Sequence, residues 1–214
     1  GFADHVRAKA AAVFALPENI DIAKSGPLLC GGVTVFAPIL DHVSPTDQVA
    51  VIGIGGLGHL AIKFLNKWGC EVTAVTRSED KASQAMIMGA HNVFTPEAFE
   101  AGEAGEGRFN MVLSTVNVPM NWGAILNTLA PRGRIHTVGA VNAPLDIPVF
   151  PLIMGQRSIG GSPVGSPNTI RTMLEFAARH DIAPQTEHFA MASVNDALEH
   201  LQTGKARYRI VLDR

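Results

Sequence analysis

Short apolar runs alternate with helical patterns through the middle of this chain. Residues 48–54 are uncharged and largely β-branched, which is typical of a strand buried on both faces. After this run, apolar side chains recur at the spacing of one helix face: Leu57, Leu60, Ala61, Phe64, Leu65 and Trp68. Gly69 then follows as a C-terminal cap. The pattern predicts a strand, a glycine turn and a helix.

The same alternation continues downstream. Further strands are predicted over residues 71–76, 92–95, 109–115, 133–141 and 157–164. Helices are predicted over residues 78–89, where Ser78 starts the helix and Gly89 ends it, and over residues 121–129. Strands and helices at this spacing pair in parallel through right-handed crossovers. We therefore expect an α/β fold, a Rossmann doubly wound parallel sheet of six strands in the order 3-2-1-4-5-6, with helices on both faces.

Both flanks of this core differ from it. Upstream, short strands are predicted over residues 3–9 and 11–16, followed by a helix over residues 25–42. Downstream, we expect a helix from Ser166 with Pro167 in its first turn, a strand over 187–190, a capping-box helix from Ser193 with Asp196, and a strand over 207–212. Because these short strands have no obvious partners within the chain, we expect them to be edges of another domain.

Composition and charge exclude several classes of protein. With 47% hydrophobic and 17% charged residues among 214, the chain is not a disordered segment. A net charge of −2 gives no basic field for nucleic acid. The longest uncharged stretch, residues 109–131, contains asparagines and prolines that do not suit a lipid-facing helix, so no membrane partner is expected. Two cysteines indicate a reducing compartment, and we expect a cytoplasmic protein.

The candidate chemistry lies between the first predicted strand and helix. Gly53, Gly55 and Gly58 form G-x-G-x-x-G there, with Gly56 and Leu57 between the last two glycines. The first glycine permits a tight turn, the second lets the backbone approach a pyrophosphate, and the third allows close packing of helix on strand. This context favours a dinucleotide site over glycines that serve packing alone.

The end of the second strand indicates which dinucleotide binds. An acidic residue at this position binds the ribose hydroxyls of NAD, but this chain has Thr76, Arg77 and Ser78 there. A guanidinium and hydroxyls suit a 2′-phosphate, and Lys81 adds a point charge one helical turn later. Ser78 is also an ordinary N-cap, a role compatible with phosphate binding. We therefore predict NADP(H) rather than NAD(H).

Two dehydrogenase classes fit the remaining residues poorly. A short-chain dehydrogenase needs a tyrosine followed four residues later by lysine, but the one tyrosine is Tyr208 and position 212 is leucine. A hydroxy-acid dehydrogenase pairs a histidine with an acid, and His136 has no acidic neighbour in the sequence. We interpret His136 as structural.

Three segments carry a family resemblance. They are P-L-L-C-G-G-V-T-V-F at residues 27–36, V-I-G-I-G-G-L-G-H at residues 51–59 and R-Y-R-I-V-L-D at residues 207–213. In this order and spacing they resemble the zinc-containing medium-chain alcohol dehydrogenases, and the cinnamyl alcohol dehydrogenase branch is the most similar. The resemblance runs from about Phe2 to Arg214.

The resemblance implies a catalytic Zn²⁺ in the intact enzyme, with Cys30 as one of its ligands. The alternative for Cys30 is a small buried residue in a helix. In that family, an N-terminal chaperonin-10-like domain precedes this region and supplies two further ligands. Since a catalytic zinc needs about three protein ligands, we expect the chain as given to be metal-free and inactive.

The resemblance also implies further cofactor contacts. Those near the nicotinamide are Thr34, Val138, Gly139 and Ser162 to Val164; Thr115 lies on the adenosine side, and Arg207 binds the pyrophosphate. For His59, at the start of the first helix of the sheet, a place beside the phosphates and a solvated position both remain open.

The implied activity is hydride transfer between NADP(H) and a primary alcohol or aldehyde. Residues 1–26 are then a remnant of the catalytic domain, 27–165 the NADP-binding Rossmann domain, and 166–214 a segment that returns to the catalytic domain. We expect a homodimer through the edge strand 157–164, which is uncharged from residue 158 onward. Two alternatives remain: a zinc-free quinone or enoyl reductase of the same superfamily, and a non-catalytic nucleotide-binding module.

Overall fold

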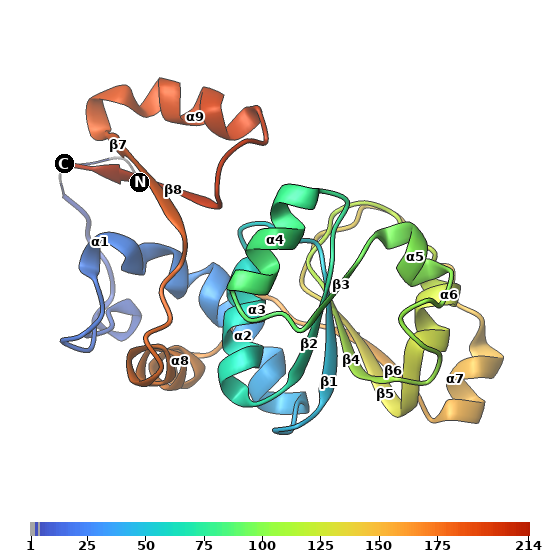
Figure 1. Cartoon of the computed structure of the whole chain (residues 1–214). Helices are drawn as coiled ribbons and strands as arrows, with labels where there is room; N and C mark the ends of the chain where they lie inside the picture. Colours follow the sequence, from blue (N-terminus) through green and yellow to red (C-terminus); the bar gives the residue numbers. More distant parts are fainter. Residues whose placement is uncertain (1–2, 4) are drawn as a thin grey trace.

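A six-stranded parallel sheet forms the centre of the protein in a computed structural model that describes residue 3 and residues 5–214 (Figure 1). Its strands lie in the order β3-β2-β1-β4-β5-β6. They are β1 (Gln48–Ile52), β2 (Glu71–Val75), β3 (Asn92–Phe94), β4 (Phe109–Ser114), β5 (Leu129–Thr137) and β6 (Ser158–Gly161). The predicted fold class and strand order are confirmed.

Helices cover both faces of this sheet (Figure 1). One face carries α2 (Gly31–His42), α3 (Gly58–Trp68), α4 (Glu79–Ile87) and α8 (Pro167–Arg179), and the other carries α5 (Pro96–Glu100), α6 (Trp122–Thr128) and α7 (Val149–Gly155). Strand β1 shows why the sheet needs both layers. Val49 and Val51 are buried in the first core, and Ala50 and Ile52 are buried in the second.

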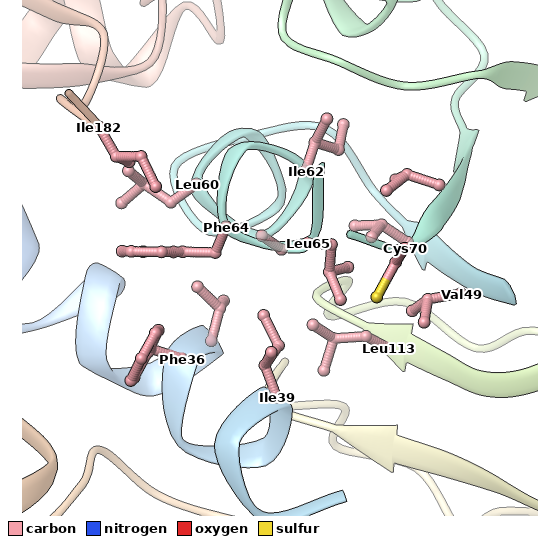
Figure 2. Close-up of a cluster of buried hydrophobic side chains, with 14 of the residues drawn as sticks. Phe36, Ile39, Val49, Leu60, Ile62, Phe64, Leu65, Cys70, Leu113 and Ile182 are labelled. Atoms are coloured by element: carbon pink, nitrogen blue, oxygen red, sulfur yellow. The ribbon is translucent and has the colours of Figure 1, made fainter. Parts of the chain in front are cut away.

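Aromatic side chains join three helices of the first layer. Phe36 of α2 lies edge-on to Phe64 of α3, with ring centroids 5.1 Å apart. Phe176 of α8 packs against both rings, at 5.5 and 6.2 Å. Figure 2 shows Phe36 and Ile39 facing Phe64 and Leu65 across this core. Helix α8, beyond the sixth strand, therefore packs on the same core as α2 and α3.

The predicted helix over residues 25–42 is wrong in its first part. The chain instead forms α1 (Ile22–Ser25) and a 3-10 turn, η2 (Gly26–Leu29), and α2 begins only at Gly31. Pro27 lies in the first turn of η2, and Cys30 leaves helical geometry with φ −120° and ψ −76°. The break places Cys30 at the N-cap of α2.

The predicted strands over residues 3–9 and 11–16 do not form in the described residues. Residue 3 and residues 5–16 contain one 3-10 turn, η1 (Ala10–Ala12), and no strand, while Asp4 lies outside the described residues. A strand is stable only when its backbone groups pair with a neighbouring strand. No strand of the described chain pairs with this segment.

The downstream strands pair with each other. Strands β7 (Thr186–Ala190) and β8 (Arg209–Asp213) form a parallel pair, so the expectation that both lacked partners was wrong. Between them lie η3 (Met191–Ser193) and α9 (Val194–Gln202). Ser193 makes no capping hydrogen bond, because its φ of −97° and ψ of 28° are not the extended geometry of an N-cap. The predicted capping box is therefore absent.

Among the described residues, no single helix is long and apolar enough to span a membrane. Residues 22–29 and 31–42 pass such a test only when they are combined, and they bend by 56° at their junction. Residues 31–39 are buried in the core of the protein.

Candidate functional site

The glycine turn joins the end of β1 to the start of α3. An added Cβ on Gly58 would lie 1.9 Å from the carbonyl oxygen of Gly53, so only glycine allows this approach. The contact holds the N-terminus of α3 at the carboxyl edge of the sheet. Free amide groups and the positive end of the helix dipole make such a terminus suitable for an anion.

An open cavity of about 660 Å³ lies over this turn. Eight of the predicted cofactor residues line it: Gly53, Gly55, Gly56, Leu57, Lys81, Thr115, Val138 and Gly139. The Thr115 hydroxyl lies 3.0 Å from the carbonyl oxygen of Ile52 and 2.8 Å from that of Gly53. Thr115 therefore ties the end of β4 to the first glycine of the turn.

A second cavity of about 250 Å³ lies at the carboxyl end of β2 and shares Gly53 and Lys81 with the first. Thr76, Arg77 and Ser78 also line it. The two cavities adjoin along the sheet edge, from β2 past the glycine turn to β5.

Two cationic side chains, Arg77 and Lys81, line the second cavity. Arg77 is exposed, and its Nε donates to Glu97 Oε1 at 3.2 Å. Ser78 caps α4 by accepting from the backbone N–H of Lys81 at 3.4 Å. Burial and, to a smaller degree, the nearby Arg207 guanidinium lower the pKa of Lys81. A phosphate bound in this cavity would place an opposite charge beside Lys81 and Arg77.

Arg209, rather than Arg207, reaches the glycine turn. Its Nε donates to the carbonyl oxygen of Gly56 at 3.0 Å, and its side chain lines the larger cavity. Arg207 lies toward α4 instead: its guanidinium is 3.6 Å from Asp80 and near Lys81, and it donates to the carbonyl oxygen of Lys205. Because the two arginines are two residues apart, sequence alone did not show which one faces the turn.

Three of the predicted nicotinamide contacts lie apart from the two adjoining cavities. Ser162 and Val164 line a separate cavity of about 690 Å³ at the end of β6. Thr34 is buried in α2, and its hydroxyl donates to the carbonyl oxygen of Cys30 at 2.7 Å. Apart from Gly58 and Arg207, the other cofactor candidates all line the two adjoining cavities, and these three do not.

Cys30 is exposed, which excludes its interpretation as a small buried residue. Within the described part of the chain, no three histidine, cysteine, aspartate or glutamate side chains lie close enough to hold a metal ion. The described residues thus do not form a zinc site on their own, because a thiolate at Cys30 supplies a single ligand.

Two histidines near the site are buried. His136 is 2% exposed, accepts from Arg134 Nε at 3.2 Å and lies 3.0 Å from Ser162 Oγ. His59 is fully buried, so the solvated position considered for it is wrong. Burial lowers the pKa of each imidazole to about 4. Both rings are therefore neutral at pH 7.

The strand order, the glycine turn and the cavity across the sheet edge define a doubly wound α/β protein of the Rossmann class. Residues 56–179, more than half of the chain, match the family model described as zinc-binding dehydrogenase. The chain belongs to this family.

Known proteins of this kind are similar over nearly the whole chain. Aldehyde reductase AdhA of Synechocystis is 54% identical over 99% of this chain and 63% of its own length. A cinnamyl alcohol dehydrogenase structure from Sorghum bicolor has a TM-score of 0.86 at 33% identity, over 92% of this chain and 57% of that one. The structure of CAD from Helicobacter pylori complexed with NADP(H) has a TM-score of 0.79 at 27% identity, over 93% and 57%. The chain thus spans about three fifths of the length of these relatives.

A pair of glycine substitutions separates packing from binding. Gly58→Ala should lower the free energy of unfolding by about 3 kcal/mol, the upper end of overpacking costs, because its Cβ meets backbone at 1.9 Å. Gly55→Ala should keep or slightly raise stability, because no atom lies within 4 Å of its added Cβ. It should nonetheless weaken dinucleotide binding, since Gly55 lines the cavity. Thermal unfolding and calorimetric titration measure the two effects; equal loss of stability in both variants would contradict this assignment.

The buried histidines should make stability depend on pH. Each has a pKa of about 4 in the folded chain, against the ordinary histidine pKa of 6.5, so between these values the unfolded chain binds more protons. The free energy of unfolding should therefore fall as pH decreases from about 6.5 to about 4. Replacing either residue with asparagine should reduce this slope by up to about 1.4 kcal/mol per pH unit in denaturant titrations. An unchanged slope in both variants would argue against buried neutral histidines.

Proposed function

We propose that this chain is the cofactor-binding part of an enzyme that transfers hydride between NADP(H) and a primary alcohol or aldehyde. The observation that carries the proposal is the path of adjoining cavities from Arg77 across the glycine turn to Gly139. Arg77 and Lys81 lie at one end of these cavities, the glycine turn at residues 55–57 lies at the centre, and Val138 and Gly139 lie at the other end. The alcohol or aldehyde substrate is supported by the names of the similar proteins.

The described residues bind the dinucleotide in three parts. The amides of residues 55–57 would hold the pyrophosphate, and Arg209, which lines the same cavity, would pair with its charge. Thr76, Arg77 and Ser78 would hold the adenosine end, and Val138 and Gly139 would hold the nicotinamide end. When bound, the cofactor supplies the hydride chemistry, and the protein holds and orients it.

The cations at the end of β2 favour NADP(H). Arg77, Ser78 and Lys81 line the smaller cavity. The carboxylate that binds the ribose of NAD is replaced there by Thr76. Arg77 can pair with a 2′-phosphate through charge-assisted hydrogen bonds. The NADP(H) complex of the similar Helicobacter pylori structure supports this preference.

Cys30 is the one zinc ligand that we propose among the described residues. Its exposed thiol lies one residue before α2, where a thiolate can face a metal held by residues outside the described chain. One ligand does not hold Zn²⁺, so we propose that the chain alone is catalytically inactive. Its two free thiols, Cys30 and Cys70, support a cytoplasmic location.

We also propose a homodimer through the edge of the sheet. Strand β6 is an edge strand, and the adjacent helix α7 exposes four apolar side chains that are 65% to 72% accessible: Val149, Phe150, Ile153 and Met154. Pairing two such edges would cover both the strand and this apolar patch.

Light scattering tests the dimer. The chain should have twice its 22.7 kDa mass in solution, and Ile153→Glu should reduce it to a monomer because a carboxylate would be buried in the interface. Lys67→Glu, on the exposed face of α3, is the matched control and should leave the mass unchanged. A monomeric wild type would refute the interface.

Calorimetric titration with NADPH and NADH, on a sample of measured zinc content, tests the cofactor. NADPH should bind more tightly, and Arg77→Ala should weaken it by about tenfold to a hundredfold, since a hydrogen bond to a charged group contributes about 1.5–3 kcal/mol. NADH binding should change little. Arg179→Ala, an exposed arginine at the end of α8, is the control. Tighter NADH binding by the wild type would overturn the proposal, and stoichiometric zinc would show that ligands have been missed.

A further inference from the structure

His59 occupies an unusual place for a polar residue. It is the second residue of α3, directly after Gly58, and its side chain is fully buried. The ring lies between the glycine turn and Gln185, the residue directly before β7. A buried polar group must find hydrogen-bond partners, so its contacts show what it holds together.

Both ring nitrogens of His59 have backbone partners. Nδ1 lies 2.8 Å from the carbonyl oxygen of Gly55, and Nε2 lies 3.2 Å from the backbone nitrogen of Gln185. Because a carbonyl oxygen only accepts, Nδ1 carries the proton. Nε2 then accepts from the Gln185 N–H. One neutral tautomer satisfies both contacts, whereas an imidazolium would lose the second.

Gln185 connects His59 to the arginine at the turn. Its carbonyl oxygen accepts from the backbone N–H of Tyr208 at 3.1 Å and from that of Arg209 at 3.2 Å. The Arg209 side chain in turn donates to the carbonyl oxygen of Gly56 at 3.0 Å. Hydrogen bonds thus run from Gly55 through His59, Gln185 and Arg209 back to Gly56, which is the neighbour of the starting residue.

Tyr208 fixes the plane of the His59 ring. The two rings are stacked, with centroids 4.9 Å apart and an interplanar angle of 19°. The Tyr208 hydroxyl donates to Gln84 Oε1 of α4, the helix that Ser78 caps. Tyr208 also lines the larger cavity. The stack therefore lies directly behind the wall of the cofactor path.

The charged groups facing His59 are cations. Lys63 of the same helix and Arg209 of β8 both disfavour a proton on the ring, in addition to the larger effect of burial. The neutral tautomer is therefore the resident form in the working range of pH.

We propose that His59 is a positioning residue for the dinucleotide site, which sets the glycine turn and Arg209 at the spacing that a pyrophosphate requires. The inference rests on the proposed function and extends it to a residue that does not touch the cofactor. Holding hydrogen-bond donors in place before binding raises affinity, because less conformational entropy is lost when the ligand binds.

Three substitutions separate the contacts of His59. His59→Phe keeps a ring against Tyr208 and removes both hydrogen bonds. His59→Asn can keep the donor to Gly55, and His59→Gln can keep the acceptor for Gln185. We expect the NADPH dissociation constant to rise about tenfold in the Phe variant, because two buried hydrogen bonds are lost. The Gln variant should recover most of the affinity, and the Asn variant should not, because the link to Arg209 runs through the acceptor.

A double-substitution cycle with Arg209→Gln tests the link itself. If His59 acts through Arg209, the double variant His59→Phe/Arg209→Gln should bind NADPH nearly as well as Arg209→Gln alone. Leu65→Ala, buried on the same helix away from the turn, is the control for general loss of stability. It should lower the melting temperature and leave the dissociation constant of the folded chain unchanged.

The outcomes distinguish this inference from the proposed function. A wild type that binds neither NADPH nor NADH would overturn the proposed function. If the wild type binds the cofactor and the His59 variants differ from it only in a lower melting temperature, the positioning role would be overturned. The positioning role would also be overturned if the two substitutions raised the NADPH dissociation constant by factors that multiply in the double variant. The two residues would then act independently.

Discussion

The close contact of Gly58 with the Gly53 carbonyl oxygen is the constraint on which the site depends. It leaves no room for a Cβ, and it brings the N-terminus of α3 against the end of β1. The amides of the turn therefore lie at the carboxyl edge of the sheet, between the ends of β2 and β5. Because β1 and β4 are the central strands, an extended ligand over the turn can contact the carboxyl ends of strands on both sides of it.

Much of this arrangement is predictable from local pattern. Val49 and Val51 alternate with Ala50 and Ile52 at the period of a strand, and the apolar positions from Leu57 to Trp68 follow the period of a helix. Repetition of this pair of patterns determines a parallel sheet, and right-handed crossovers limit its strand order. The glycine spacing placed the turn correctly for the same reason, since its context is local.

The remaining features depend on contacts distant in sequence. Arg209 reaches Gly56 across 153 residues, and Gln185 reaches His59 across 126. No periodicity near either residue indicates these partners, so the sequence does not single out Arg209, and it leaves two positions open for His59. The pairing of β7 with β8 is not predictable from the sequence, because a strand of five residues carries no local pattern that identifies its partner. The break at Cys30 had a local signal in Pro27, which the apolar pattern around it outweighed.

The central claim is that a dinucleotide lies on the glycine turn and is held there by the Arg209 segment. Hydrogen–deuterium exchange of the chain with and without NADPH tests it most directly, because it reports on backbone amides one segment at a time. With NADPH bound, we expect slower exchange at residues 53–60 and 207–210, together with the start of α4 near Ser78. Protection confined to the cavity at Ser162 and Val164, with residues 53–60 unchanged, would contradict it.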